Sequence, residues 1–184
     1  MQRGSVTLTV NLVGLREAVF NVLGYENDKA GREILHKVVE TAVDVAKKKG
    51  KELGDDVRIS MTEGGGASRF AVLDGEKYGK NSALKTVETY SEGVVLDSGE
   101  QYTAKSDGIA ECNRLSKMLN GGLLVMLPLD RDADDGKIRE VLERTAGLIA
   151  RFRPVKPVSI CGGCGYKDGR LEGRCPRCKS SNIL

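Results

Sequence analysis

Residues 120–154, NGGLLVMLPLDRDADDGKIREVLERTAGLIARFRP, contain the two clearest secondary-structure patterns in the chain. The uninterrupted apolar run 123–127 predicts a strand that is buried on both faces. Apolar residues then recur three and four positions apart from Ile138 to Phe152, which predicts an amphipathic helix that Pro154 ends. A buried strand followed by a helix is typical of α/β layering with parallel strands, and this is the fold class that we expect.

The segments before residue 120 alternate between strands and helices in the same way. Residues 6–12 alternate apolar and polar side chains, which predicts a strand with one buried face. A wide apolar stripe, followed by the lysines and glycine of 47–50, predicts a long helix that begins after the caps Asn27 and Asp28 and runs to about Leu53. The remaining patterns predict helices over 14–23, 67–73 and 106–119 and strands over 57–61 and 94–96.

The 184-residue chain carries 29 basic and 26 acidic residues, a net charge of +3, and 40% of its residues are apolar. This composition can form a hydrophobic core and is too weakly basic to predict a nucleic-acid surface by itself. No apolar run reaches the roughly 18 residues of a membrane span, and residues 1–5 do not begin a signal peptide. We therefore expect a soluble cytoplasmic protein with an α/β domain over 1–154 and a different tail over 155–184.

Four of the five cysteines lie in that tail, in two pairs that each enclose two residues. This spacing lets each pair bind one metal ion through two thiolates. Four thiolates suit Zn²⁺ or a rubredoxin-like iron, and we favour zinc because nothing else in the chain indicates electron transfer. A complete shell of four ligands predicts a structural zinc ribbon, with two disulfides or four free thiols as the alternatives. The predicted ligands are Cys161, Cys164, Cys175 and Cys178.

Basic residues around the cysteine pairs make a nucleic-acid-binding ribbon an alternative function for the tail. Single-stranded nucleic acids are usually bound by stacking on aromatic side chains, and Tyr166 is the one aromatic residue of the tail. We therefore do not expect nucleic acid to be a partner. The basic residues are Arg170, Arg174, Arg177 and Lys179.

Several segments resemble, in order, the catalytic subunit of anaerobic, class III ribonucleoside-triphosphate reductase, a glycyl-radical enzyme. Residues 11–18, NLVGLREA, resemble its GLVGLNEA segment, and residues 161–178 resemble its CxxCGY…CPxC zinc site. Together the likenesses extend from about residue 11 to residue 182. Between these ends, 69–74 is similar to RFAxxD, 101–103 to YTNS and 120–122 to TGG.

The resemblance implies the C-terminal part of a ten-stranded α/β barrel of the glycyl-radical type, followed by a zinc domain. Enzymes of this family reduce ribonucleoside triphosphates to DNA precursors. Their radical glycine is activated by an S-adenosylmethionine iron–sulfur enzyme and oxidises a cysteine to a thiyl radical, which takes a hydrogen atom from the ribose. The resemblance also implies Tyr102 as a substrate-binding residue of the reductase site.

The radical residues of the family have no counterpart in this sequence. The radical glycine of the family follows the zinc site, whereas six residues follow Cys178 here. Gly165 resembles part of the radical motif, but it adjoins the predicted ligand Cys164. Cys112, the fifth cysteine, is expected to be a buried core residue because it lies on the apolar side of a predicted helix. We expect the one histidine, His36, to be a satisfied surface or core residue.

These observations predict a C-terminal segment or truncated homologue of the reductase that is not catalytic alone. The alternative is a non-catalytic zinc-ribbon protein that binds a nucleotide, a reductase subunit or nucleic acid. A partial barrel exposes strand edges that a partner must cover. The expected partner is therefore a second copy of the chain or the remaining reductase segment, with a nucleotide as a further candidate ligand.

Overall fold

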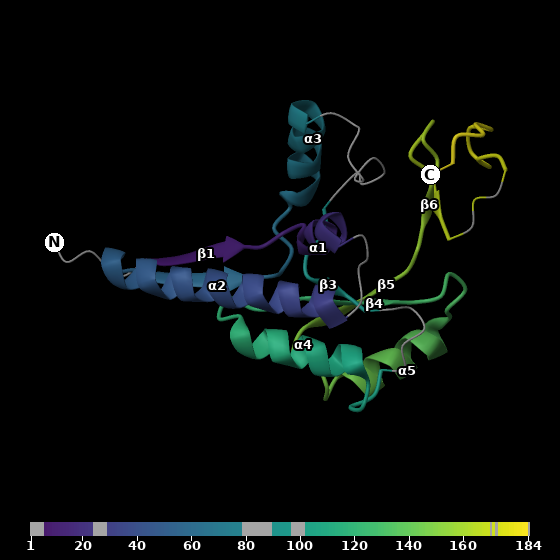
Figure 1. Cartoon of the computed structure of the whole chain (residues 1–184). Coiled ribbons are helices and arrows are strands. Elements are labelled where there is room, and N and C mark those ends of the chain that lie inside the picture. Colours follow the sequence, from purple (N-terminus) through teal and green to yellow (C-terminus); the bar gives the residue numbers. More distant parts are fainter. Residues whose placement is uncertain are drawn as a thin grey trace. The chain divides into compact units, whose positions relative to one another are not determined.

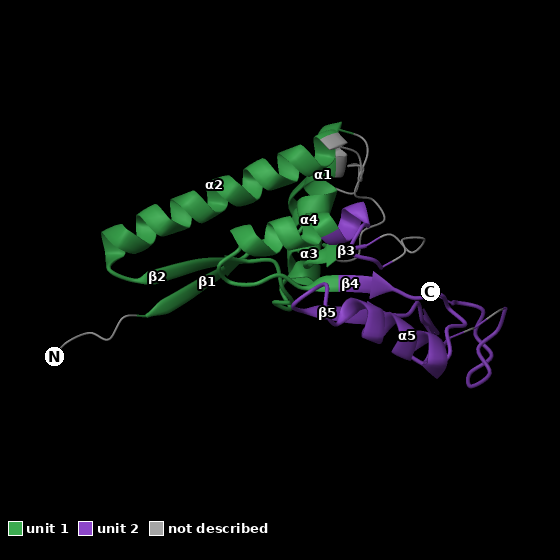
Figure 2. Cartoon of the chain, turned by 90° about the horizontal axis from the view of Figure 1, so that it is seen from below, with its two compact units in different colours: residues 1–94, 110–125 green, residues 95–109, 126–184 purple. Residues whose placement is uncertain are grey.

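The computed structural model describes residues 6–23, 29–78, 90–96, 102–169, 171 and 173–183. The chain divides into two compact units, which we describe separately (Figure 2). The first unit comprises residues 1–94 and 110–125, and the second comprises residues 95–109 and 126–184.

Two parallel strands and a long helix form the centre of the first unit. Strands β1 (Thr7–Asn11) and β2 (Asp56–Ser60) pair in parallel, with Thr7 beside Asp56 and Asn11 beside Ser60. The 25-residue helix α2 (Lys29–Leu53) lies between them in sequence, as a parallel crossover requires. Helices α1 (Leu15–Leu23) and α3 (Ala67–Tyr78) follow β1 and β2 (Figure 1).

The later elements are shorter. A three-stranded sheet has the order β3-β4-β5, and β6 and β7 form an antiparallel pair. The strands are β3 (Val94–Val95), β4 (Val125–Pro128), β5 (Phe152–Val155), β6 (Ser159–Ile160) and β7 (Lys167–Asp168). The helices are α4 (Asp107–Met118) and α5 (Asp135–Thr145).

Helix α2 packs against β2 through one buried side. Val39, Val43 and Ala46 are at most 5% exposed on this side. At the end of the helix, a Cβ atom added to Gly50 would lie 2.7 Å from the carbonyl oxygen of Asp55. Glycine therefore allows the close approach of helix and strand, and the predicted end of this long helix is confirmed.

The prediction that β1 has one buried face is wrong. Val6, Leu8 and Val10 are 54%, 44% and 50% exposed. Their alternation with polar residues does form a strand, as predicted. However, α2 covers β2, and no described element covers the apolar face of β1.

The helix predicted from Ile138 to Phe152 ends seven residues earlier than predicted, because α5 ends at Thr145. Its first turn is fixed by Asp134, whose Oδ1 accepts a hydrogen bond of 2.8 Å from the backbone N–H of Lys137. Helical spacing continues past Gly147, a poor helix former, but the chain there forms turns and then β5.

Phe152 therefore belongs to a strand and not to the predicted helix. The backbone N–H of Leu129 donates a 2.8 Å hydrogen bond to the carbonyl of Val155, which ties the end of β5 to the chain after β4. Pro154 can lie within β5 because this strand is at the edge of its sheet, where a missing N–H is tolerated.

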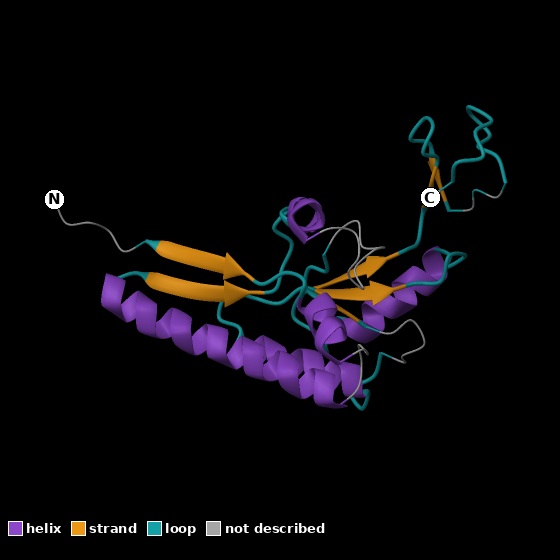
Figure 3. Cartoon of the chain, turned by 45° about the horizontal axis from the view of Figure 1, so that its top comes forward, coloured by secondary structure: helices purple, strands orange, loops and turns teal. Residues whose placement is uncertain are grey.

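The α/β class is confirmed as a mixed fold with small parallel and antiparallel sheets (Figure 3). The described residues do not form a closed barrel. The predicted helices over 14–23 and 106–119 are confirmed as α1 and α4. Among the described helices, none has the length and apolar character needed to cross a membrane.

Candidate metal centre

The first cysteine pair lies on a tight backbone knuckle next to β6. The N–H of Gly165 donates to the carbonyl of Cys161 at 2.8 Å, and the N–H of Cys161 donates to the carbonyl of Tyr166 at 2.8 Å. Gly165 has a φ of +70°, a conformation that glycine adopts without steric cost. The knuckle thus turns the chain so that Cys161 and Cys164 face the same point.

The second pair lies on a knuckle with the same hydrogen bonds. The N–H of Lys179 donates to the carbonyl of Cys175 at 2.9 Å, and the N–H of Cys175 donates to the carbonyl of Ser180 at 2.8 Å. Lys179 has a φ of 61° and is the one residue other than glycine with a positive φ in the described part of the chain. Both knuckles therefore need a left-handed residue directly after their second cysteine.

The two knuckles bring all four predicted ligands together. The four Sγ atoms lie within 4.8 Å of one another. The Sγ atoms of Cys161 and Cys178 are 3.4 Å apart, and those of Cys164 and Cys175 are 3.7 Å apart. Thiolates at about 2.3 Å from a tetrahedral Zn²⁺ would be separated by about 3.8 Å, so the donor set fits this ion.

The protein surrounds the sulfurs unevenly. Cys161 and Cys175 are at most 1% exposed, whereas Cys178 is exposed. Burial raises the pKa of the Cys161 thiol, but N–H groups of Cys164 and Gly163 and the neighbouring thiols together lower this pKa to about 6. The N–H of Ser180 lowers the pKa of Cys178, but the neighbouring thiols and burial raise it to about 12. Without a metal ion, some of the four thiols therefore keep their protons. A bound cation would replace these protons.

The glycines inside the first pair lie against residues 180–182, a contact that the spacing of the cysteines did not predict. A Cβ atom added to Gly162 would lie 2.4 Å from the amide nitrogen of Asn182, and one added to Gly163 would lie 3.1 Å from Cβ of Ser180. The N–H of Gly162 also donates to the carbonyl of Asn182 at 2.9 Å. Residues 180–182 thus pack against the first knuckle, and a side chain at Gly162 or Gly163 would have to displace the side chain of Asn182 or Ser180.

Residues 1–183 match the family described as anaerobic ribonucleoside-triphosphate reductase. The chain belongs to this family. No curated protein matches the sequence significantly.

Solved reductases of this family have a similar fold. The Thermotoga maritima anaerobic ribonucleotide reductase in complex with dATP and CTP matches 96% of this chain with a TM-score of 0.56 and 19% identity. The same enzyme with glycerol in its active site gives a TM-score of 0.55 at 18% identity. The chain spans 29% and 28% of these two chains, less than a third of the length of the reductase.

Tyr102, the residue that the reductase resemblance implies at the substrate site, is 8% exposed. Its hydroxyl donates a 3.0 Å hydrogen bond to the carbonyl of Pro128, at the end of β4. This contact anchors the ring to a strand end. Substrate binding by Tyr102 stays a prediction.

Cys112 lies in the core, as expected, and His36 is a core residue whose ring is only partly satisfied by hydrogen bonds. His36 is 6% exposed, and its Nε2 pairs with the carboxylate of Glu111, while its buried Nδ1 has no partner within the described part of the chain. Cys112 is 1% exposed in α4. Cys112 is not one of the four clustered cysteines, so a substitution of Cys112 can serve as the control in tests of metal binding.

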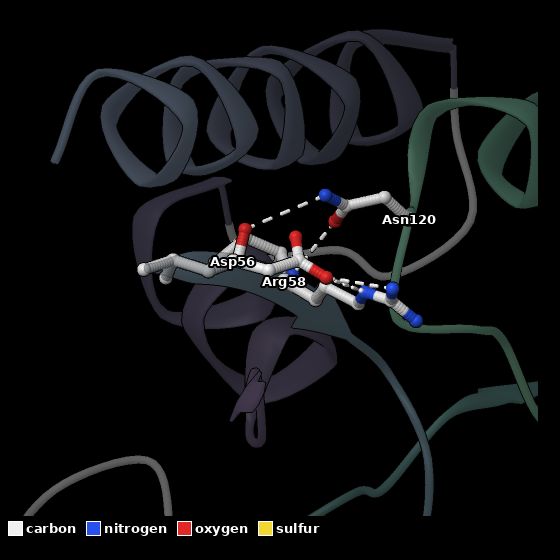
Figure 4. A network of polar contacts seen from close by, with 5 residues as sticks. Asp56, Arg58 and Asn120 are labelled. Carbon is white, nitrogen blue, oxygen red and sulfur yellow. Dashed lines mark hydrogen bonds and ion pairs between the residues drawn. The ribbon is translucent and has the colours of Figure 1, made fainter. Parts of the chain in front are cut away.

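The NGG segment at 120–122, which resembles TGG of the reductases, docks on β2. Oδ1 of Asn120 accepts a 2.8 Å hydrogen bond from the N–H of Ile59, and Nδ2 of Asn120 donates to the carbonyl of Val57 at 3.5 Å (Figure 4). A Cβ atom at Gly121 would lie 2.8 Å from the carbonyl oxygen of Ile59. The segment that follows α4 is therefore fixed by a tertiary contact with β2.

Asn11 makes a similar contact at the carboxyl ends of β1 and β2, and sequence reasoning gave it no role. Its Nδ2 donates to the carbonyl of Thr62 at 2.7 Å, and its Oδ1 accepts from the N–H of Thr62 at 2.8 Å. Oγ of Ser60 donates to the same oxygen at 2.9 Å. The amide thus fixes the chain where it leaves β2, at the strand ends where α/β folds commonly bind ligands.

Proposed function

We propose that this chain is a C-terminal segment or truncated homologue of the anaerobic reductase, and that its tail is a structural zinc ribbon. The carrying observation is the set of four thiol sulfurs within 4.8 Å of one another. The family match over residues 1–183 supports the reductase relationship. A thiolate site needs reduced cysteines, which supports a cytoplasmic location.

The tail residues would hold the ion and supply no open position for a reaction. A bound Zn²⁺ would cross-link the two knuckles and act as their shared core. The N–H of Gly163, 3.4 Å from Sγ of Cys161, would stabilise the charge on that thiolate. Leu171 is buried against the cluster, and Tyr166 and Ile183 pack beside it, so water is kept from one side of the site.

We also propose that the chain alone does not reduce ribonucleotides. Gly165 is part of the metal knuckle, with its N–H bonded to Cys161, which disfavours a role as the radical glycine. Cys112 is buried in α4, which disfavours a role as the thiyl cysteine. The α/β part would then serve as one portion of a larger reductase scaffold.

Metal analysis of protein purified without added metal tests the ribbon. We expect about one zinc per chain, reduced severalfold in Cys175→Ser and unchanged in the control Cys112→Ser. One iron per chain would show that the site is a rubredoxin-like iron site and not a zinc site. Less than half an equivalent of any metal in the unmodified chain would refute the site.

Electron paramagnetic resonance tests the radical proposal. After anaerobic incubation with a reductase activase and S-adenosylmethionine, we expect no glycyl-radical signal and no dCTP from CTP. A signal that disappears in Gly165→Ala would contradict the proposal. The same mixture with the intact Thermotoga maritima reductase and its activase is the positive control.

A nucleic-acid-binding ribbon is the second candidate, favoured by exposed basic side chains near the knuckles. Lys167, Arg174, Arg177 and Lys179 are exposed, and Arg170 lies outside the described residues. Binding through these side chains would weaken steeply with added salt. No binding of a labelled oligonucleotide at roughly 50 mM salt, where such contacts are strong, would remove this candidate.

A further inference from the structure

Asparagine is followed directly by glycine at one place in the sequence, Asn120–Gly121, just after the end of α4. This pair is chemically reactive, because glycine has no Cβ atom to hinder an attack of its backbone nitrogen on the preceding side-chain amide. Asn120 is exposed, so water reaches its side chain. The pair therefore meets the chemical conditions for spontaneous deamidation.

The structure holds both reacting groups of this pair against the edge of β2 (Figure 4). Oδ1 of Asn120 accepts a 2.8 Å hydrogen bond from the N–H of Ile59, and the N–H of Gly121 donates to the carbonyl of the same residue at 2.8 Å. A residue in a parallel sheet bonds to its neighbouring strand in this way, through both its N–H and its carbonyl. The Asn120 side chain thus takes the place of a backbone carbonyl in a strand pairing.

The pairing continues along the next residues. The N–H of Met61 donates to the carbonyl of Gly122 at 2.9 Å, and the N–H of Leu124 donates to the carbonyl of Met61 at 2.8 Å. Met61 and Leu123 accordingly form a parallel bridge. Residues 120–124, which we call the docked segment, therefore bind the β2 edge through a continuous series of hydrogen bonds.

These contacts oppose the reaction. Deamidation requires the backbone nitrogen of Gly121 to lose its proton and to approach Cγ of Asn120. In the docked segment this proton is bonded to the carbonyl of Ile59, and the Asn120 amide is held by the N–H of Ile59. Both hydrogen bonds must open before the nitrogen can attack, so the rate should follow the population of the open segment.

The fold requires the glycine that makes the pair reactive. A Cβ atom added to Gly121 would lie 2.8 Å from the carbonyl oxygen and 2.9 Å from the carbonyl carbon of Ile59. A larger residue would slow the attack, but it would also push the segment away from β2. Close docking and chemical reactivity therefore have the same cause, the missing side chain.

We propose that Asn120 is a deamidation site that docking on β2 keeps unreacted, and that its conversion releases the docked segment. In the open segment, the deprotonated nitrogen of Gly121 attacks Cγ of Asn120. A C–N bond forms, the Cγ–Nδ2 bond breaks, and Nδ2 takes up a proton and leaves as ammonia. Water then adds to one carbonyl carbon of the resulting succinimide ring and breaks its bond to the Gly121 nitrogen. Addition at Cγ gives aspartate, and addition at the backbone carbonyl carbon gives isoaspartate.

Both products fit the edge of β2 less well than asparagine does. Nδ2 of Asn120 donates to the carbonyl of Val57 at 3.5 Å, and aspartate would place an oxygen acceptor there instead of a donor. Isoaspartate inserts a methylene group into the backbone before Gly121. The N–H of Gly121 is then displaced from the carbonyl of Ile59, so isoaspartate should release the segment more completely than aspartate.

Mass spectrometry of the full zinc-loaded chain tests the site. The chain is incubated in mildly alkaline buffer, either folded or in guanidinium chloride, and is then digested with trypsin. Fragment 118–131 contains Asn120 as its one side-chain amide, and fragment 106–114 contains Asn113, which is followed by arginine, as the internal control. Fragment 118–131 should deamidate at least about tenfold more slowly in the folded chain, because the docked segment must open first. Asn113 should change far more slowly than Asn120 in the unfolded chain.

Equal rates in the folded and the unfolded chain would overturn the protection by docking. Absence of deamidation at Asn120 in the unfolded chain would overturn the site itself. Unfolded Asn120→Gln should lose the rapid mass change, because its longer side chain cannot close the five-membered ring. A rapid change that persists in this variant would also overturn the site, and the folding of the variant does not affect this result.

Hydrogen exchange tests the release of the segment. The products carry an added carboxylate, so ion exchange separates the deamidated chain from the intact chain. Amides of 57–61 should exchange faster in the deamidated chain, whereas those of α5 in the second unit should keep their protection as the control. Unchanged exchange over 57–61, or equally increased exchange in α5, would overturn the local release. Neither experiment depends on the reductase relationship.

Discussion

The two knuckles of the candidate metal site share their backbone hydrogen bonds but differ in the residue that follows the second cysteine. Gly165 holds this position in the first knuckle and Lys179 in the second, with φ values of 70° and 61°. A residue with a Cβ costs about 1 kcal/mol or more in this conformation, whereas glycine does not. The comparison shows that the turn, and not its sequence, is what the site requires.

Removal of the bound metal should have the largest effect on the structure of the two knuckles. Each knuckle supplies two of the four ligands, so neither can keep a closed site alone. We expect a strong chelator to raise amide exchange in 161–166 and 175–180 together, while α2 keeps its protection. Loss of protection in one knuckle only would show that the two fold independently.

Adding a side chain to the first knuckle should have the next largest effect. Gly165→Ala places a Cβ in the left-handed conformation, and we expect a loss of about 1 kcal/mol, or roughly fivefold in zinc affinity. Competition with a chromophoric chelator measures this change. Gly169→Ala is the control, because an added Cβ there meets no atom within 4 Å and its φ is not positive. Equal affinities of the two variants would contradict the role given to Gly165.

Relieving the second knuckle should produce a smaller effect of opposite sign. Lys179→Gly removes the steric cost but gives the unfolded tail more conformational freedom, so the gain should stay below about 1 kcal/mol. The same competition assay should show tighter zinc binding. Weaker binding would mean that the lysine side chain contributes to the site and that the knuckles differ in more than strain.

The knuckles also show which parts of the structure could be predicted. The two-residue spacing within each cysteine pair is local, so it predicts the ligand set from sequence alone. The fit of Asn182 against Gly162 depends on a return of the chain that no local pattern reports. The same limit applies to the α/β part, where alternation predicts β1 correctly but cannot show that none of the described helices covers its apolar face.

Helix α5 shows a second limit of local patterns. Its apolar spacing continues beyond Thr145, so periodicity alone extends the helix to Phe152. The structure instead places Phe152 in β5, which bonds to the chain after β4. Strand pairing between residues far apart in sequence therefore outweighs the local helical pattern.

The residue after each left-handed position also differs, since it is Tyr166 in the first knuckle and Ser180 in the second. Substitutions at the side-chain contact of Tyr166 should have the smallest effect on zinc affinity. The hydroxyl of Tyr166 donates a 3.2 Å hydrogen bond to the carboxylate of Asp168, and this contact raises the pKa of the phenol above its ordinary value. The protonated phenol is favoured in the folded tail, so any stability from this contact is present below the ordinary tyrosine pKa. It is lost as pH rises through the raised value.

Asp168→Asn should return that tyrosine to its ordinary titration range, measured as tyrosinate absorbance against pH, with Tyr166→Phe identifying the signal. Zinc affinity at neutral pH should stay nearly unchanged in both variants, because the first cysteine of each knuckle bonds to the backbone carbonyl of this residue, and phenylalanine keeps the ring that packs beside the site. A clear loss of affinity in Tyr166→Phe would show that the ring hydroxyl supports the first knuckle, and that Ser180 is then not its equivalent in the second.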